Sequence, residues 1–131
     1  MRLSIALLLA LWAMPAVAAE CSSGNSSFLK VQDVQLKTSS SGVLGAISYV
    51  SSAEKIIKLA HVLIQFDDVL GEHIGSIATP IDESIIPKVP GQLHFSSGSV
   101  DRLKSIRTEN LSTLICVKDV LYVDGEKQSF D

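Results

Sequence analysis

Segments in which apolar and polar residues alternate recur along the chain, and turn-forming residues separate them. The clearest segment is Ile57–Asp67, where Val62, Ile64 and Phe66 stand at every second position. Because successive side chains of a β-strand point to opposite faces, each such segment is expected to bury one face and expose the other. About six or seven of them, at intervals of about 8 to 12 residues, are typical of a β-sandwich.

Composition favours the same class of fold. Residues 20–131 contain eleven Val and eleven Ile but only four Ala, and branched side chains fit a pleated surface better than a helix. We therefore predict an all-β, immunoglobulin-like antiparallel sandwich of about six to eight strands. The strands are expected at Leu29–Lys37, Val43–Val50, Ile57–Asp67, Glu72–Ala78, Gln92–Ser97, Ser112–Val123 and, as a short edge, Lys127–Phe130.

Residues within these segments predict finer features. Ile57–Asp67 is expected to lie centrally in its sheet, with Gln65 and Asp67 on the outer face, and Glu72–Ala78 is expected nearer an edge. Gly45, inside a predicted strand, indicates a bulge or a close approach of neighbouring backbone.

The chain between the later strands is expected to be less regular. Thr79–Gly91 contains three prolines, which cannot donate hydrogen bonds within a sheet, so a loop or an irregular edge is predicted. Ser99–Arg107 predicts a short helical turn, because Ser99 is a suitable N-cap and apolar residues follow at threefold spacing. A strand crossover is the alternative there. The spaced apolar residues are Val100, Leu103 and Ile106.

The N-terminus has the three-part layout of a secretory signal peptide. A basic residue precedes the apolar run Leu3–Met14, and small residues follow it. This run is shorter than the roughly 20 residues that cross a bilayer, so we expect residues 1–19 to be a leader cleaved after Ala18 or Ala19. Residues 20–131 are then one exported domain, periplasmic or secreted, without stable membrane insertion.

Cys21 and Cys116 are the two cysteines, and an exported chain reaches a compartment where thiols oxidise. We predict a disulfide between them, which ties the N-terminal arm to a late strand. Their spacing is unlike that of a Cys-x-x-Cys redox pair, so thiol catalysis is not expected. A lipid anchor on Cys21 is the alternative, but Glu20 stands where a lipoprotein signal has a small residue.

The order of features from Gly45 to Gly125 resembles the small bacterial sandwich modules of the FxLYD type. The polar turn has Ser51-Ser52 where an Asn is usual. The resemblance implies an extracytoplasmic, non-catalytic module used for contacts, and it carries no catalytic residues. The matching segments are Ile47-Ser48-Tyr49, Val62-Leu63-Ile64-Gln65-Phe66-Asp67, Gly71, Pro90-Gly91-Gln92 before Leu93-His94-Phe95, and Val123-Asp124-Gly125.

Three histidines, His61, His73 and His94, are the candidates for a zinc site. If Asp67 pairs with Glu72 across the following turn, His61 and His73 face opposite sides of the sheet, unless a bulge shifts the register. We therefore predict no metal and no cofactor, and histidines that are solvated or partly packed.

Other chemistries have little support in the sequence. Asp67, Asp68 and Glu72 cluster at one turn but lack the regular spacing of a calcium loop, so a solvated turn is expected. No Gly-x-Ser-x-Gly elbow or glycine-rich phosphate loop occurs. The net charge of −3, without a basic and aromatic patch, argues against nucleic acid as a partner. Asn25 and Asn110 match the glycosylation pattern, which matters only in a eukaryotic host.

The proline-rich stretch is the candidate site for a protein partner. Proline limits the freedom of the apolar residues beside it, which lowers the entropic cost of binding. The alternative is that these isoleucines close one end of the core. The candidate residues are Pro80, Ile81, Ile85, Ile86, Pro87, Val89 and Pro90.

Together these observations predict a small exported, non-catalytic module that binds a protein or serves as an accessory part of an assembly. The alternative is a metal-dependent or hydrolytic enzyme whose site is built around His61, His73 or His94.

Overall fold

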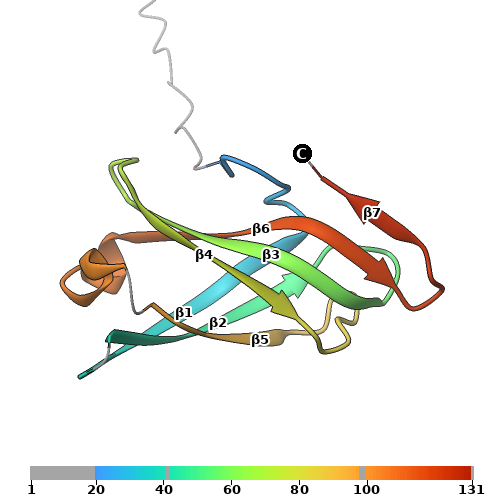
Figure 1. The fold of residues 1–131 in the computed structure, drawn as a ribbon, viewed down its shortest axis with the longest axis horizontal. Coiled ribbons are helices and arrows are strands. Elements are labelled where there is room, and N and C mark those ends of the chain that lie inside the picture. Colours follow the sequence, from blue (N-terminus) through green and yellow to red (C-terminus); the bar gives the residue numbers. More distant parts are fainter. Residues whose placement is uncertain (1–19, 41, 98–99, 131) are drawn as a thin grey trace, which may run out of the picture.

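The computed structural model describes residues 20–40, 42–97 and 100–130, so the predicted leader, residues 1–19, lies outside the described residues. The described chain is all-β apart from two short 3₁₀ turns, which confirms the predicted fold class. Figure 1 shows two packed layers of strands. The strands are β1 (Leu29–Ser39), β2 (Gly42–Ser51), β3 (Ile57–Asp68), β4 (His73–Ile81), β5 (Gly91–Ser96), β6 (Leu111–Tyr122) and β7 (Lys127–Ser129).

The strands form two antiparallel sheets, with the orders β1-β2-β5 and β4-β3-β6-β7 (Figure 1). As predicted, β3 is central and β4 lies at an edge. In a constant-type immunoglobulin domain the fourth strand lies beside the fifth, whereas here β4 pairs with β3. The inner faces of both sheets meet in one core, whose largest fully buried side chains include Ile47, Ile57, Ile64, Phe66 and Ile115.

The glycine inside β2 marks a close approach, but by a side chain and not by backbone. Gly45 pairs in regular register with Leu36 on β1 and Phe95 on β5. A Cβ on Gly45 would lie 2.1 Å from Cζ of Phe95. The Phe95 ring therefore lies directly over Gly45 and contacts Phe66 of the other sheet, with ring centroids 5.3 Å apart. A glycine is needed here to let the two sheets pack.

For residues 79–81 the structure has an edge strand and not a loop, so of the two predicted alternatives the edge holds there. β4 continues to Ile81 and includes Pro80, which pairs with His61. Proline is tolerated because β4 is an edge strand, where a residue that cannot donate is able to turn its nitrogen to the open side.

The predicted helical turn is present as a 3₁₀ helix, η1 (Asp101–Lys104), and a second turn, η2 (Thr108–Asn110), follows it. Val100 is the N-cap residue of η1, while the predicted cap Ser99 lies outside the described residues. Leu103 is buried in the core, as its spacing predicted.

The N-terminal arm, residues 20–25, lies against the outer face of the larger sheet. The predicted disulfide between Cys21 and Cys116 of β6 is confirmed, with Cα atoms 5.7 Å apart. Because both sulfurs are engaged, Cys21 cannot carry a lipid thioether at the same time. Asn25 exchanges two backbone hydrogen bonds of 2.9 Å with Val117, so the arm pairs with β6 as well.

Within the described residues, no helix is long and apolar enough to span a bilayer.

Candidate functional site

The structure divides the predicted partner-binding loop into a buried part and an exposed part. Ile81 and Ile85 are 5% and 3% exposed and belong to the core. Ile85 exchanges backbone hydrogen bonds of 2.8 and 3.0 Å with Ile57 of β3, so it extends the sheet beyond β4. For these two residues the alternative interpretation holds, because they close one end of the sandwich.

The exposed part joins residues from elsewhere in the chain. Ile56 is 38% exposed, Ile86 48%, Val89 49% and Val123 56%. We call these four residues the apolar end. They come from the chain before β3, from the proline-rich loop and from the chain after β6.

Strand pairing explains why three of these side chains lie side by side. Ile57 lies between Ile85 and Tyr122, and all three point inward. When residues i and j pair in antiparallel strands, residue i−1 lies opposite residue j+1. The side chains of this next pair point to the other face of the sheet. Ile56 therefore stands outward between Ile86 and Val123, and a hydrogen bond of 3.1 Å from the Val123 N–H to the Ile56 carbonyl fixes the second pair.

The loop that carries Ile86 and Val89 is held by its own backbone. The Val89 N–H donates to the Ile86 carbonyl at 3.2 Å, and the Lys88 N–H donates to the Ser51 carbonyl at the end of β2, also at 3.2 Å. Lys88 has a φ of 63°, which is a left-handed conformation that closes the turn. The exposed aliphatic residues are thus presented on backbone that is already ordered.

A charged group borders the apolar end. Lys55 forms ion pairs with Asp124 and Glu126 across the β6–β7 turn, and its ammonium lies 4.6 Å from the centroid of the Tyr122 ring. Hydrogen bonds to these two carboxylates raise the pKa of Lys55. The apolar end therefore has an apolar centre and a charged rim, as protein interfaces do.

The three histidines lie apart from one another. Of the two predicted registers, the one with a bulge is present: Asp67 pairs with His73 and not with Glu72, so His73 and His61 share one face. His73 lies beside Asp67, which is six residues from His61 along β3, so the two histidines are roughly 20 Å apart. His94 lies on β5 of the other sheet. Within the described residues, no group of three His, Cys, Asp or Glu side chains is placed to hold a metal ion.

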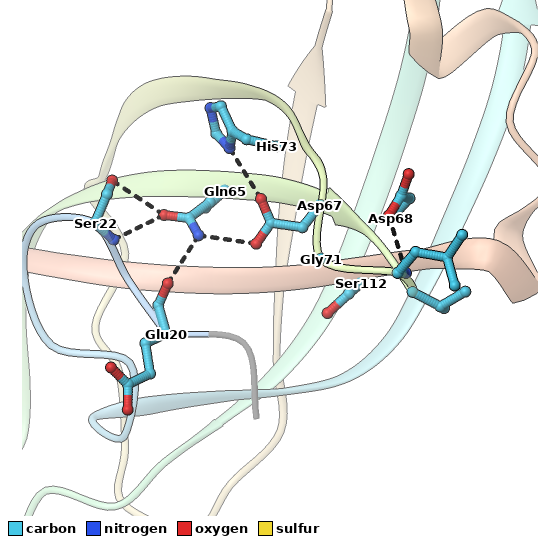
Figure 2. A pocket seen from close by; sticks show the side chains of 10 residues that line it. Glu20, Ser22, Gln65, Asp67, Asp68, Gly71, His73 and Ser112 are labelled. Carbon is cyan, nitrogen blue, oxygen red and sulfur yellow. Dashed lines mark hydrogen bonds and ion pairs between the residues drawn. The ribbon is translucent and has the colours of Figure 1, made fainter. Parts of the chain in front are cut away.

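A second feature is a hollow of about 790 Å³ at the β3–β4 turn, beneath the start of the arm. Gln65 lines this hollow and lies between Ser22, Glu20 and Asp67, to which it is hydrogen-bonded (Figure 2). Its Nε2 donates to the Glu20 carbonyl and to Asp67 Oδ2, both at 2.9 Å, and its Oε1 accepts from the Ser22 N–H at 3.0 Å. His73 Nδ1 lies 2.9 Å from the other oxygen of Asp67.

Gln65 and Asp67 lie on the outer face, as predicted, but this part of the face is covered. The arm covers Gln65, and both residues are buried. Alternation within β3 predicts the direction of these side chains, but it carries no information on a cover supplied by residues 20–22.

The expectation that the β3–β4 turn is solvated was wrong, because Asp68 is buried and its carboxylate accepts hydrogen bonds that hold the turn. Asp68 Oδ1 accepts from the N–H groups of Leu70 and Glu72 at 2.9 and 3.0 Å, and Oδ2 accepts from Arg102 at 3.1 Å. These hydrogen bonds, that from Glu72 first, lower the pKa of Asp68. The carboxylates of Asp67 and Asp68 are thus engaged by the protein's own donors. At the tip of the turn Leu70 is 92% exposed.

No family model, curated protein or solved structure matches this chain.

Sequence reasoning missed Ile56 and Val123 as members of the site. The signal was present, because Ile56 and Ile57 are adjacent isoleucines at the start of a strand, and two adjacent strand residues cannot both face the core. Val123 follows Tyr122 in the same way. What no single segment reveals is that the two residues lie beside Ile86.

Proposed function

We propose that this protein is an exported, non-catalytic module that binds another protein through the apolar end. The leader-like residues 1–19 and the disulfide support a periplasmic or secreted location, since disulfides persist where thiols oxidise. The resemblance to FxLYD-type modules points to the same kind of role, a contact module outside the cytoplasm.

The observation that carries the proposal is the exposure of four aliphatic side chains on ordered backbone. Scattered apolar residues on a surface need no explanation, but contiguous ones often mark an interaction site. Because the turns around Ile86 and Val123 are already hydrogen-bonded, binding there orders little additional backbone. A partner would offer an apolar surface and polar groups for the rim around Lys55.

The test is cross-linked affinity capture of the tagged protein from its native envelope or secreted fraction, read by mass spectrometry. We expect one partner near stoichiometry, and we expect it to be lost when Ile86→Ser and Val123→Ser are combined. The matched control is Leu70→Ser, which removes an exposed leucine at the other end of β3. Melting temperatures of all variants should stay close to that of the wild type.

Ile85→Ser separates binding from stability. Ile85 is buried, so this change should lower the melting temperature strongly, while the Ile86→Ser change one residue later should not. Capture of the same partner by the Ile86→Ser, Val123→Ser variant would refute the assignment of the apolar end. Loss of capture in the Leu70→Ser control would place the contact at the β3–β4 turn instead.

A further inference from the structure

The larger sheet ends in a long strand edge that carries no charged side chain to oppose pairing. A bulge at Ile74 lies towards one end of this strand and Pro80 towards the other, and they leave residues 75–79 regular. Within the described residues, β3 is the strand that pairs with β4, and the other side of β4 is open. Exposed edges normally carry charges, bulges or short strands that prevent edge-to-edge association. β4 is nine residues long and contains no Asp, Glu, Lys or Arg.

The other edges differ from β4 in these respects. β1 carries Lys30, Asp33 and Lys37. β7 has three residues and begins with Lys127, and β5 has six residues. The longest uncharged edge of the fold is therefore β4.

The direction of the free backbone groups of β4 follows from β3. Ile57 faces inward and sends its N–H and C=O to Ile85, on the β4 side. Along a strand, residues whose side chains point to the same face also point their N–H and C=O groups to the same side. The inward residues of β3 therefore form their backbone hydrogen bonds with β4, as Ile57 does with Ile85 on the same side of β3. Ile64 is one of them, and its partner is Ile77.

The residues between these bonded positions turn their N–H and C=O groups to the open side. They are Ser76, Ala78 and Pro80, which pair with the outward residues of β3. The position of Pro80 agrees with this assignment, because its nitrogen has no hydrogen to donate to β3. Ser76 and Ala78 thus offer two donors and two acceptors to a further strand.

We propose that β4 pairs antiparallel with β4 of a second copy of this chain, about a two-fold axis at Ile77. Ser76 of one copy then lies opposite Ala78 of the other, and each such pair exchanges two backbone hydrogen bonds. Every free N–H and C=O of Ser76 and Ala78 is used. The two four-stranded sheets become one continuous sheet with β4 at its centre.

Three observations favour a second copy as the occupant. The edge is uncharged, so two identical edges bring no like charges opposite each other. The outward side chains near the axis, Ser76 and Ala78, are small. Ile77 is partly exposed and faces inward, and the two-fold axis places it against its own symmetry mate in a closely spaced pair.

The test is the mass of the disulfide-bonded protein in solution, by sedimentation equilibrium over a range of concentrations. We expect a reversible dimer. Ala78→Pro removes an N–H on the open side and leaves the bonds to β3 in place, as Pro80 does already, so it should raise the dimer dissociation constant at least tenfold.

A second variant covers the case in which Ala78→Pro fails to fold. Ser76→Lys adds a charge to the edge and should weaken the dimer to a similar degree, while Gln35→Lys on β1 should leave it unchanged. The Ile86→Ser, Val123→Ser variant should dimerise as the wild type does, so this test is independent of the apolar end. A protein that stays monomeric at roughly millimolar concentration, or a dimer that neither β4 variant weakens, overturns the proposal.

Discussion

Asp68 shows how one side chain can set the conformation of a turn. Its carboxylate accepts two backbone N–H groups of the β3–β4 turn and one guanidinium hydrogen of Arg102. These hydrogen bonds hold Leu70 at the tip of the turn, where its side chain is exposed. The sequence placed a turn here correctly, but a cluster of acids does not by itself distinguish a solvated turn from one that a buried carboxylate organises.

The charge of Asp68 should make part of the stability depend on pH. Its pKa lies below the ordinary value of 3.8 in the folded protein. A depressed pKa contributes stability that is present above the unfolded pKa and is lost as the pH falls through the folded one. Asp68→Asn should therefore lower the melting temperature at pH 7, and the difference from the wild type should shrink below about pH 4.

Thermal unfolding followed by circular dichroism at pH 7 and pH 3 measures this difference. Asp33→Asn, at an exposed position on β1, is the matched control. A difference between wild type and Asp68→Asn that stays constant across this range would contradict the assignment.

Gly45 is the residue at which a single methyl group should matter most. A Cβ there would overlap the Phe95 ring, so Gly45→Ala should destabilise the fold by about 1 to 3 kcal/mol, the usual range for overpacking. Denaturant unfolding gives this value. Adding Phe95→Leu to Gly45→Ala should recover part of the lost free energy of unfolding. If the destabilisations of the two single variants simply add in the double variant, the Phe95 ring is not the obstacle.

At the scale of elements, the alternation of residues was a good guide to which segments are strands and a poorer guide to where they end. β3 was predicted to within one residue, because its apolar side chains from Ala60 to Phe66 are buried at every second position. β4 was predicted to end at Ala78, since prolines follow. The prolines were the wrong signal, because an edge strand tolerates a residue that lacks an N–H on its open side.

The site could be predicted only in part for the same reason. Ile86 and Val89 were identified from the loop, but Ile81 and Ile85 in the same stretch are core residues. Which isoleucines are buried depends on the bridge between Ile85 and Ile57, a contact between segments far apart in the sequence. A local pattern does not encode such a contact.

The arm is the element whose attachment can be tested directly. The disulfide closes a loop of 95 residues, for which the chain-entropy model gives on the order of 4 to 5 kcal/mol. Replacing Cys21 and Cys116 together by Ala should lower the free energy of unfolding by up to this amount. The backbone amide of Val117, which is bonded to Asn25, should also exchange with solvent faster.

Denaturant unfolding and hydrogen exchange of the oxidised, reduced and double-alanine proteins measure these effects. The amide of Ile85, bonded to Ile57 and remote from the arm in sequence, is the internal control. Unchanged protection of Val117 would show that the arm stays in place without the disulfide.

At the scale of the molecule, the features with functional interest are spread around one rigid sandwich. The apolar end lies where β3 begins, the exposed tip of Leu70 follows where β3 ends, and the open edge of β4 runs between them. A partner at the apolar end and a second copy at β4 would therefore occupy different surfaces.

The covalent link between residues 21 and 116 also determines how this protein responds to mechanical force. Tension applied between the N-terminal arm and the C-terminus passes through the sulfur bridge into β6, so the chain from β1 to β5 lies inside a covalently closed ring that the pull cannot extend. Only the chain after Cys116 can be drawn out, which at about 3.5 Å per residue is roughly 50 Å of contour length. In a single-molecule pulling experiment, reduction should increase this length to roughly 390 Å. A protein attached at both ends would thus keep most of its fold under a pull that unravels β7 and the part of β6 that follows Cys116.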